Sequence, residues 1–298
     1  MRNRLLGLSA IQPRPSLVDQ HWKEERIMAE EIKQEEQLLE VETDEEPKEL
    51  LPSEDPNNVL VVEDLMKSYG AKEVLKGINL EVHKGEVFGF IGKNGAGKST
   101  TIDCIVGLKE PTSGKIYVCN NDIHEKPLEA KKCIGYVSSE PTAYEMMTGK
   151  DYLEFIGSSY GMYQAAFDKN LAFIQKKFKM PVEDLNRRIH EYSHGMKQKI
   201  CLMASLVHNP KIWIMDEPTV GLDIIVYQTL IEMIQDFAKN GKTVFVTSHD
   251  IDLVTKVCDR VAIINNGVVS ELIDFKQNPL KRRDLARIFF STYGEEEE

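Results

Sequence analysis

One glycine-rich segment holds the residues best suited to chemistry in this 298-residue chain. The segment GKNGAGKST, residues 92–100, fits the pattern G-x-x-x-x-G-K-[ST]. In such a loop, backbone N–H groups wrap a phosphate, the lysine reaches the β- and γ-phosphates, and the hydroxyl ligates Mg²⁺. The sequence therefore predicts that Lys98 binds phosphate and that Ser99 binds magnesium. The candidate phosphate-binding residues are Gly92, Asn94, Gly95, Ala96, Gly97, Lys98, Ser99 and Thr100.

The surroundings of this loop decide between two interpretations. A glycine turn that merely joins a strand to a helix would give the same letters. Here the loop follows an apolar run, Val87–Ile91, that is typical of a buried strand, and it precedes a predicted helix at Thr100–Leu108. This placement favours a nucleoside triphosphate site, because the strand and the helix N-terminus must hold the loop against the phosphates.

Two adjacent carboxylates follow a second apolar run, residues 212–215. A buried strand there would deliver Asp216 to the carboxyl edge of the sheet, beside the phosphate loop. Asp216 is then the second candidate magnesium ligand, and Glu217 is the candidate base for the water that attacks the γ-phosphate. Without the phosphate loop, a strand that simply ends in solvent would be the better interpretation.

Several short motifs follow the phosphate loop in a fixed order: YSHGMKQ at 192–198, DEPT at 216–219, GLD at 221–223 and TSHD at 247–250. This ordered set resembles the nucleotide-binding domain of ATP-binding-cassette (ABC) transporters. The resemblance covers about residues 59–272, and the tail to Gly294 is also similar. The fold that it implies is an α/β P-loop NTPase domain with a mainly parallel core sheet, a small antiparallel β-subdomain and an inserted helical subdomain.

The resemblance also implies roles for four further residues. Ser193 and Gly195 would contact the γ-phosphate held by the opposite protomer, so that two chains sandwich two ATP molecules head to tail. His249 would contact the γ-phosphate as a switch, and Tyr69 would stack on adenine. These residues have ordinary alternatives. Ser193 and Gly195 could simply form a helix cap, and His249 and Tyr69 could be residues at strand ends.

Three positions depart from the family pattern. Ser139 stands where the family has the glutamine of the Q-loop, and it is too short to copy that reach, so a water or Glu140 would have to complete the magnesium shell. His194 and Met196 replace a glycine and the glutamine of the signature motif. The Tyr-Ser-x-Gly-Met form of signature is similar to that of exporter-type cassettes with a separate membrane subunit.

The hydrophobic pattern supplies the elements that must position these residues. Strand-like runs occur at 59–62, 78–82, 87–91, 134–137, 212–215, 244–247 and 261–264. Helical lengths separate most of them, which predicts a mainly parallel sheet covered on both faces. We expect an acidic, disordered extension at 1–57, an ABC-type ATPase domain at 58–294 with a helical subdomain at about 141–206, and an acidic tail at 295–298.

The distributions of charge and of cysteine argue against a nucleic-acid-binding protein and against a protein held together by disulfide bonds. Residues 1–57 hold 15 acidic and 7 basic residues, which leaves 30 basic and 29 acidic residues for positions 58–294. This near-neutral body argues against nucleic acid as a partner. The five cysteines form no C-x-x-C pair, which predicts reduced thiols. No apolar run approaches the ~18 residues of a membrane-spanning helix.

The function expected from the sequence is ATP hydrolysis, with Glu217, His249 and Lys98 as catalytic residues and ATP and Mg²⁺ as cofactors. The expected partners are a second copy or a homologous ATPase subunit and a separate multi-span membrane subunit, at the cytoplasmic face of the membrane. The alternative is a soluble cassette ATPase that acts on a protein assembly such as a metallocluster scaffold. A translation-associated or DNA-associated cassette is a third reading, disfavoured by the single phosphate loop and the neutral body.

Overall fold

A computed structural model describes residues 53–140 and 142–294. Most of the predicted extension at 1–57 and the tail at 295–298 lie outside the described residues. Residues 53–57 form turns ahead of the first strand, and the carbonyl of Asn57 accepts a hydrogen bond from the backbone N–H of Lys84 at 2.7 Å.

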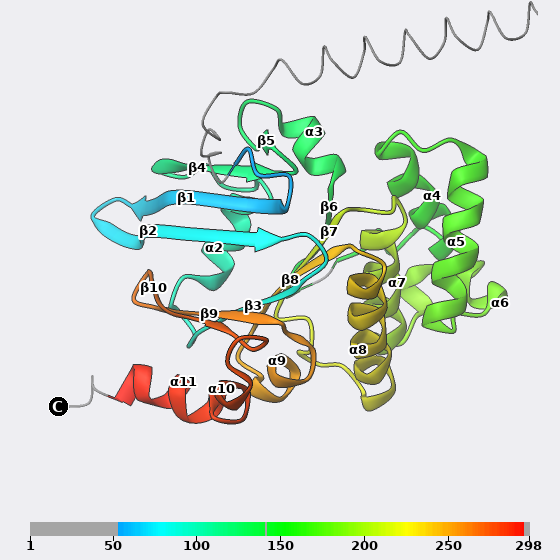
Figure 1. Cartoon of the computed structure of the whole chain (residues 1–298). Coiled ribbons are helices and arrows are strands. Elements are labelled where there is room, and N and C mark those ends of the chain that lie inside the picture. The colour runs from blue at the N-terminus through cyan, green and yellow to red at the C-terminus, as the bar shows by residue number, and fades with distance from the viewer. Residues whose placement is uncertain (1–52, 141, 295–298) are drawn as a thin grey trace, which may run out of the picture. The chain divides into compact units, whose positions relative to one another are not determined.

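A six-stranded sheet forms the centre of the fold, in the order β10-β9-β3-β8-β7-β6 (Figure 1). Its strands are β3 (Val87–Ile91), β6 (Ile134–Val137), β7 (Ile212–Asp216), β8 (Thr243–Ser248), β9 (Arg260–Asn265) and β10 (Val268–Asp274). All neighbouring strands are parallel except β10, which runs antiparallel to β9. The prediction of a mainly parallel core sheet is confirmed.

Helices or strands cover both faces of this sheet, which explains why its strands read as almost uninterrupted apolar runs. Alternate residues of each strand enter two different hydrophobic cores. Val87, Trp213 and Val244 belong to the core shared with helices α7, α8, α9 and α11, whereas Phe88 and Phe245 belong to the core shared with α2 and the second sheet. The rings of Phe88 and Phe245 stack with their centroids 5.7 Å apart.

The second sheet is antiparallel and has the order β2-β1-β4-β5. Its strands are β1 (Asn58–Tyr69), β2 (Lys72–His83), β4 (Ser113–Val118) and β5 (Asn121–Asp122). The expected small antiparallel subdomain is therefore present. The strands β4, β5 and β10 have no counterpart among the predicted runs, because their residues are half exposed and alternate with polar side chains.

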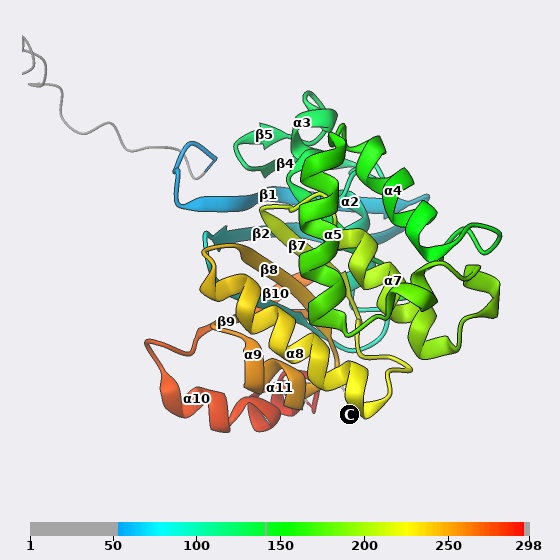
Figure 2. The same cartoon turned by 90° about the vertical axis from the view of Figure 1, so that its right-hand side faces the viewer.

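Helices fill the stretch predicted to be helical and lie together on one side of the core sheet (Figure 2). They are α4 (Gly149–Ser159), α5 (Gln164–Phe178), α6 (Val182–Leu185), the 3₁₀ turn η1 (Ile189–Glu191) and α7 (His194–Leu206). Thr148 and Ser193 cap α4 and α7, each with a side-chain oxygen that accepts a backbone N–H of the first turn.

The other helices of the described residues are α2 (Lys98–Ile105), α3 (Pro127–Lys132), α8 (Ile224–Lys239), α9 (Ile251–Val257), α10 (Pro279–Arg283) and α11 (Leu285–Gly294). The helix predicted at Thr100–Leu108 is α2, which begins two residues earlier and ends at Ile105. None of the helices described here is both long enough and apolar enough to cross a bilayer.

Strand register brings three loops to one edge of the core sheet. Ile91 of β3 pairs with Ser248 of β8, and Thr247 of β8 pairs with Asp216 of β7. Because the three strands are parallel and end level with one another, the segments after Ile91, Asp216 and Ser248 emerge side by side. These segments hold the phosphate loop, Glu217 and His249.

Helix α7 packs closely on the sheet at Gly135 of β6. A Cβ atom at this position would lie 2.2 Å from the carbonyl oxygen of Ser205 on α7 and 2.8 Å from Pro210. We therefore expect Gly135→Ala to lower the free energy of unfolding by ~1–3 kcal/mol, the usual cost of overpacking. Thermal or urea unfolding measures it. Gly294→Ala, whose Cβ would meet nothing within 4 Å, is the control. Equal stability of the two variants would contradict this account of the contact.

Candidate nucleotide-binding site

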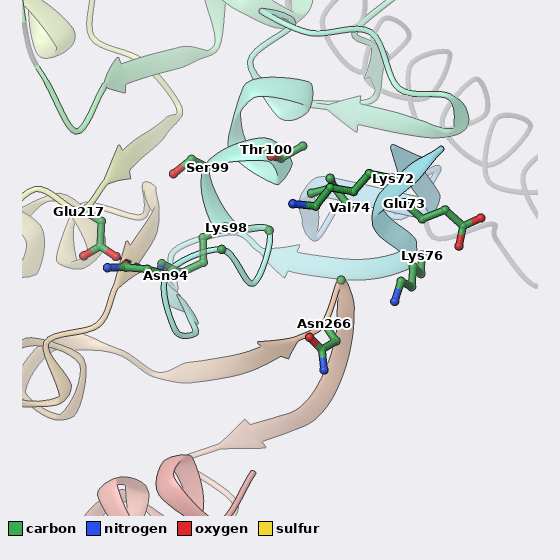
Figure 3. Close-up of a pocket in the computed structure, with 13 residues that line it drawn as sticks. Lys72, Glu73, Val74, Lys76, Asn94, Lys98, Ser99, Thr100, Glu217 and Asn266 are labelled. Carbon is green, nitrogen blue, oxygen red and sulfur yellow. Dashed lines mark ion pairs between the residues drawn. The ribbon is translucent and has the colours of Figure 1, made fainter. Parts of the chain in front are cut away.

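A cavity of about 560 Å³ opens beside the phosphate loop (Figure 3). The loop and the start of α2 form one wall, β2 and the β9–β10 turn form another, and Glu217 lies at the end near Lys98. The lining residues are Lys72, Glu73, Val74, Lys76, Asn94, Gly95, Gly97, Lys98, Ser99, Thr100, Glu217, Asn266 and Gly267. The structure thus brings the phosphate loop and the second predicted carboxylate together.

Two glycines give the phosphate loop its path. Gly95 and Gly97 have φ angles of +82° and +116°, which favour glycine. At Gly97 a Cβ would also lie 2.7 Å from a side-chain carbon of Leu75, so the loop can approach β2 only at a glycine. α2 begins at Lys98 immediately afterwards, and its unpaired N–H groups and dipole favour an anion at that end.

Lys98 is 5% exposed, and three oxygens lie around its ammonium group, one of them the carbonyl of Lys93 at 3.4 Å. Nζ donates a hydrogen bond to the carbonyl of Gly92 at 2.6 Å and lies 3.1 Å from Oε1 of Glu217. A buried ammonium needs such partners, because removing its hydration is costly. Lys98 lines the cavity, on the side where the sequence predicts contact with phosphate oxygens.

Glu217 has an uncommon backbone conformation. Its φ of +47° lies in the left-handed region, which costs of order 1–3 kcal/mol for a residue with a side chain and persists only where neighbouring contacts enforce it. The enforcing contacts come from Thr247, whose carbonyl and hydroxyl oxygens lie 3.2 and 3.0 Å from the backbone N of Glu217. His249 holds the carboxylate: its backbone N and Nδ1 lie 3.2 and 2.8 Å from Oε2.

Thr247 also fixes Asp216, which is 3% exposed. The threonine hydroxyl donates to Oδ1 of Asp216 at 2.5 Å and accepts from the N–H of Glu217. One hydroxyl therefore holds the carboxylate of Asp216 and the backbone of Glu217. Sequence reasoning assigned no role to this threonine, although its position within the TSHD motif contains the signal.

The fit of this site to Mg²⁺ rests on donor chemistry. Among the described residues, no three His, Cys, Asp or Glu side chains gather as a metal-binding group. Ser99 lines the cavity on the side of the loop that faces Glu217 (Figure 3), and Asp216 precedes Glu217 at the same sheet edge. One hydroxyl and one carboxylate, with substrate phosphates and waters, are the ligands with which Mg²⁺ is usually held. The residues present therefore fit the ion.

Other predicted residues lie away from the cavity lining. Tyr69 is half exposed, with the ammonium groups of Lys67 and Lys109 5.1 and 5.7 Å from its ring centroid. Ser193 is exposed at the start of α7, where its hydroxyl accepts the N–H of Met196 at 3.3 Å. The roles of Tyr69, Ser193 and Gly195 toward the nucleotide stay predictions.

The sequence matches the family described as "ABC transporter" over residues 75–220. It is 39% identical to the linearmycin resistance ATP-binding protein LnrL of Bacillus subtilis over 205 residues, which cover 69% of this chain and 66% of LnrL. It is 36% identical to the ABC transporter ATP-binding protein NatA of the same organism over 198 residues, covering 66% of this chain and 80% of NatA. The chain belongs to the ABC transporter ATPases.

A solved structure agrees with this membership at the level of the fold. An ATP-binding cassette determined as a dimer bound to ADP and phosphate superimposes with a TM-score of 0.66 at 24% identity, covering 72% of this chain and 98% of that one. The family binds and hydrolyses ATP, and the cavity described above lies at the phosphate loop of this ABC transporter ATPase.

The C-terminal helix of this ABC transporter ATPase contributes a residue that sequence reasoning missed. The hydroxyl of Tyr293 on α11 accepts the backbone N–H of Lys93 at 2.9 Å and donates to the carbonyl of Ile264. The ammonium group of Lys93 lies 4.7 Å from the centroid of the same ring. A residue 200 positions away in sequence therefore fixes the start of the phosphate loop.

The β9–β10 turn also supports the phosphate loop, through backbone hydrogen bonds of Gly267. The backbone N–H of Gly267 donates to the carbonyl of Ala96, and the carbonyl of Gly267 accepts the N–H of Lys76. A Cβ at Gly267 would lie 2.3 Å from the carbonyl oxygen of Val74, and φ there is +79°, so only glycine fits. The cavity is thus built from four chain segments: β2, the phosphate loop with the start of α2, Glu217 and the β9–β10 turn.

Tyr293→Phe isolates the contribution of α11. Removing the hydroxyl leaves the N–H of Lys93 and the carbonyl of Ile264 without this partner, so the loop should sample other conformations. We expect the Kd for ATP to rise three- to tenfold, or on the order of 1 kcal/mol. Titration with a fluorescent ATP analogue measures it. Phe290→Ala, an exposed position on the same helix, is the control. Unchanged affinity in Tyr293→Phe would show that α11 does not position the loop.

Proposed function

We propose that this chain powers export through a separate membrane subunit by binding and hydrolysing ATP as a head-to-tail dimer. The observation that carries the hydrolytic part is the convergence of Lys98 and His249 on the two carboxylate oxygens of Glu217, at 3.1 and 2.8 Å, beside the phosphate loop. No other arrangement in the described residues places a base, an ammonium group and a phosphate loop together.

The chemistry follows from these positions. Phosphate oxygens replace Glu217 as the anionic partner of Lys98, which frees the carboxylate for a water molecule. Glu217 takes a proton from that water, and the oxygen of the water bonds to the γ-phosphorus. At the same time the bond from the γ-phosphorus to the bridging oxygen breaks and ADP is released. Ser99 and Asp216 would hold Mg²⁺, which would neutralise phosphate charge when bound. His249 keeps the carboxylate oriented.

Surface features support dimer formation. Ser193 and His194 are exposed at the N-terminus of α7, outside the nucleotide cavity of their own chain. Near them, three large apolar side chains are exposed around the start of α8: Val220, Ile224 and Ile225 at 54, 83 and 65%. An exposed apolar patch beside a polar helix terminus suits a partner surface. A second copy would cover the patch and bring Ser193 to the γ-phosphate.

The transport part of the proposal rests on the relatives and on the helical subdomain. LnrL is named for linearmycin resistance, which suits removal of a compound from the cell. Tyr144, Met146 and Phe155 are exposed beside the loop after β6. We place the membrane subunit on this surface, with the ATPase at the cytoplasmic face of the membrane. The transported substrate is a property of that subunit.

Glu217→Gln tests the catalytic assignment. The amide keeps the shape of the side chain and cannot accept the proton, so turnover should fall by roughly 100-fold or more while ATP affinity stays within a few-fold. Gel filtration with ATP should show an accumulated dimer. Glu232→Gln, an exposed glutamate on α8, is the control. Turnover near that of the control would remove Glu217 from the mechanism.

Mixed subunits test the head-to-tail arrangement. Lys98→Ala disables the phosphate loop, and Ser193→Arg disables the signature that serves the other chain. A heterodimer of the two retains one complete site, so an equal mixture should recover about a quarter of the wild-type ATPase activity if the two sites act independently. A mixture of Lys98→Ala with Glu217→Gln should recover none, because both changes affect the same half of a site. Equal recovery in both mixtures would contradict the arrangement.

A further inference from the structure

Glu217 lines a second, much smaller cavity as well as the nucleotide cavity. The second cavity has a volume of about 20 Å³ and lies between the loop after β6, helix α7 and the segment after Glu217. Ser139, Gln198 and Val220 are among its lining residues. A volume of ~10–15 Å³ is enough for one water molecule, provided that polar partners are present.

Gln198 supplies one of these partners. The side chain is 7% exposed, and its Nε2 donates to the carbonyl of Val220 at 3.1 Å. A carbonyl can only accept, so this bond fixes the orientation of the amide and leaves Oε1 pointing away from Val220. Within the described residues, Oε1 is buried with no hydrogen-bond partner. A buried acceptor of this kind costs free energy unless a donor reaches it.

The carboxylate of Glu217 supplies a second polar partner for a water molecule in this cavity. Its Oε1 lies 3.1 Å from Nζ of Lys98 but outside hydrogen-bonding geometry, so that contact is an ion pair without a directed hydrogen bond. Oε2 already accepts from His249. In the proposed mechanism Lys98 turns to the phosphates, and Oε1 then needs a different donor to keep the carboxylate in place.

We propose that one water molecule occupies this small cavity and that Gln198 thereby acts as a positioning residue for Glu217. The water donates one hydrogen to Oε1 of Gln198 and one to Oε1 of Glu217, and it accepts the hydroxyl hydrogen of Ser139. Both buried acceptors then have a donor, and each hydrogen of the water is used. The inference rests on the proposed role of Glu217 as the base.

This arrangement also accounts for the serine at the Q-loop position. Ser139 is too short to reach far by itself, but a water held jointly with Gln198 extends its reach to Glu217. Gln198 lies on α7, the same helix that begins at Ser193 and His194. A shift of α7 relative to β7 would therefore move the water and misalign the carboxylate, which links the helical subdomain to hydrolysis.

The test compares Gln198→Met with a matched variant. Methionine keeps the length and bulk of glutamine and removes the acceptor. In single-turnover hydrolysis by the full-length protein, the rate should fall about tenfold, as expected from misplacing a catalytic group, while the Kd for ATP stays within twofold. Gln228→Met, an exposed glutamine on α8, should behave as wild type. A rate for Gln198→Met equal to that of Gln228→Met would overturn the proposal.

Ser139→Ala supplies a second readout, which a purely structural role for Gln198 would not give. If both side chains act through one water, their effects are not additive. Ser139→Ala should slow hydrolysis a few-fold in the wild type and by less than twofold in the Gln198→Met background. Rate effects that multiply would contradict a shared water.

A crystal structure of the wild-type protein at better than ~2 Å keeps the proposal testable even if the Met variant fails to fold. Electron density for one water within hydrogen-bonding distance of Gln198 and Glu217 is expected, and a dry cavity would overturn the inference. Glu217→Gln, measured beside these variants, separates the two proposals. If Glu217→Gln is active, the catalytic assignment fails; if it is inactive and Gln198→Met is normal, only the role of Gln198 fails.

Discussion

The ion pair between Lys98 and Glu217 joins the two parts of the site, the phosphate loop and the catalytic edge of the sheet. Both side chains are largely buried, at 5% and 12% exposure, so neither charge is stable there alone. Their 3.1 Å contact exists only because β3, β8 and β7 are parallel and end level with one another. The register of these strands therefore determines how close the phosphate loop lies to Glu217.

Glu217, at the same edge of the sheet, has a strained backbone conformation. Glu217 holds a left-handed conformation because Thr247 accepts its N–H and simultaneously donates to Asp216. A single hydroxyl on β8 thus contacts the carboxylate of Asp216 and the backbone of Glu217. His249, two residues after Thr247, contacts the carboxylate of Glu217, so the end of β8 and the residue that follows it hold both the backbone and the side chain of Glu217.

Much of this protein was determined by local sequence. Glycines at 92, 95 and 97, followed by Lys98 and Ser99, specify a phosphate loop because only glycine tolerates the required φ angles and close contacts. Apolar runs of strand length predicted the strands of the core sheet except β10, and the order of the motifs indicated the ABC family. Strands β4, β5 and β10 escaped prediction because half-exposed strands have weak hydrophobic patterns.

Only the tertiary structure decided which distant residues complete the site. Tyr293 and the Asn266–Gly267 turn belong to no motif, and each contacts the phosphate loop across many residues of intervening chain. Sequence patterns report periodicity and backbone tolerance, which are local properties. The hydrogen bond that the phosphate loop donates to α11 depends instead on how helices pack on the sheet, and that packing is set by the whole core.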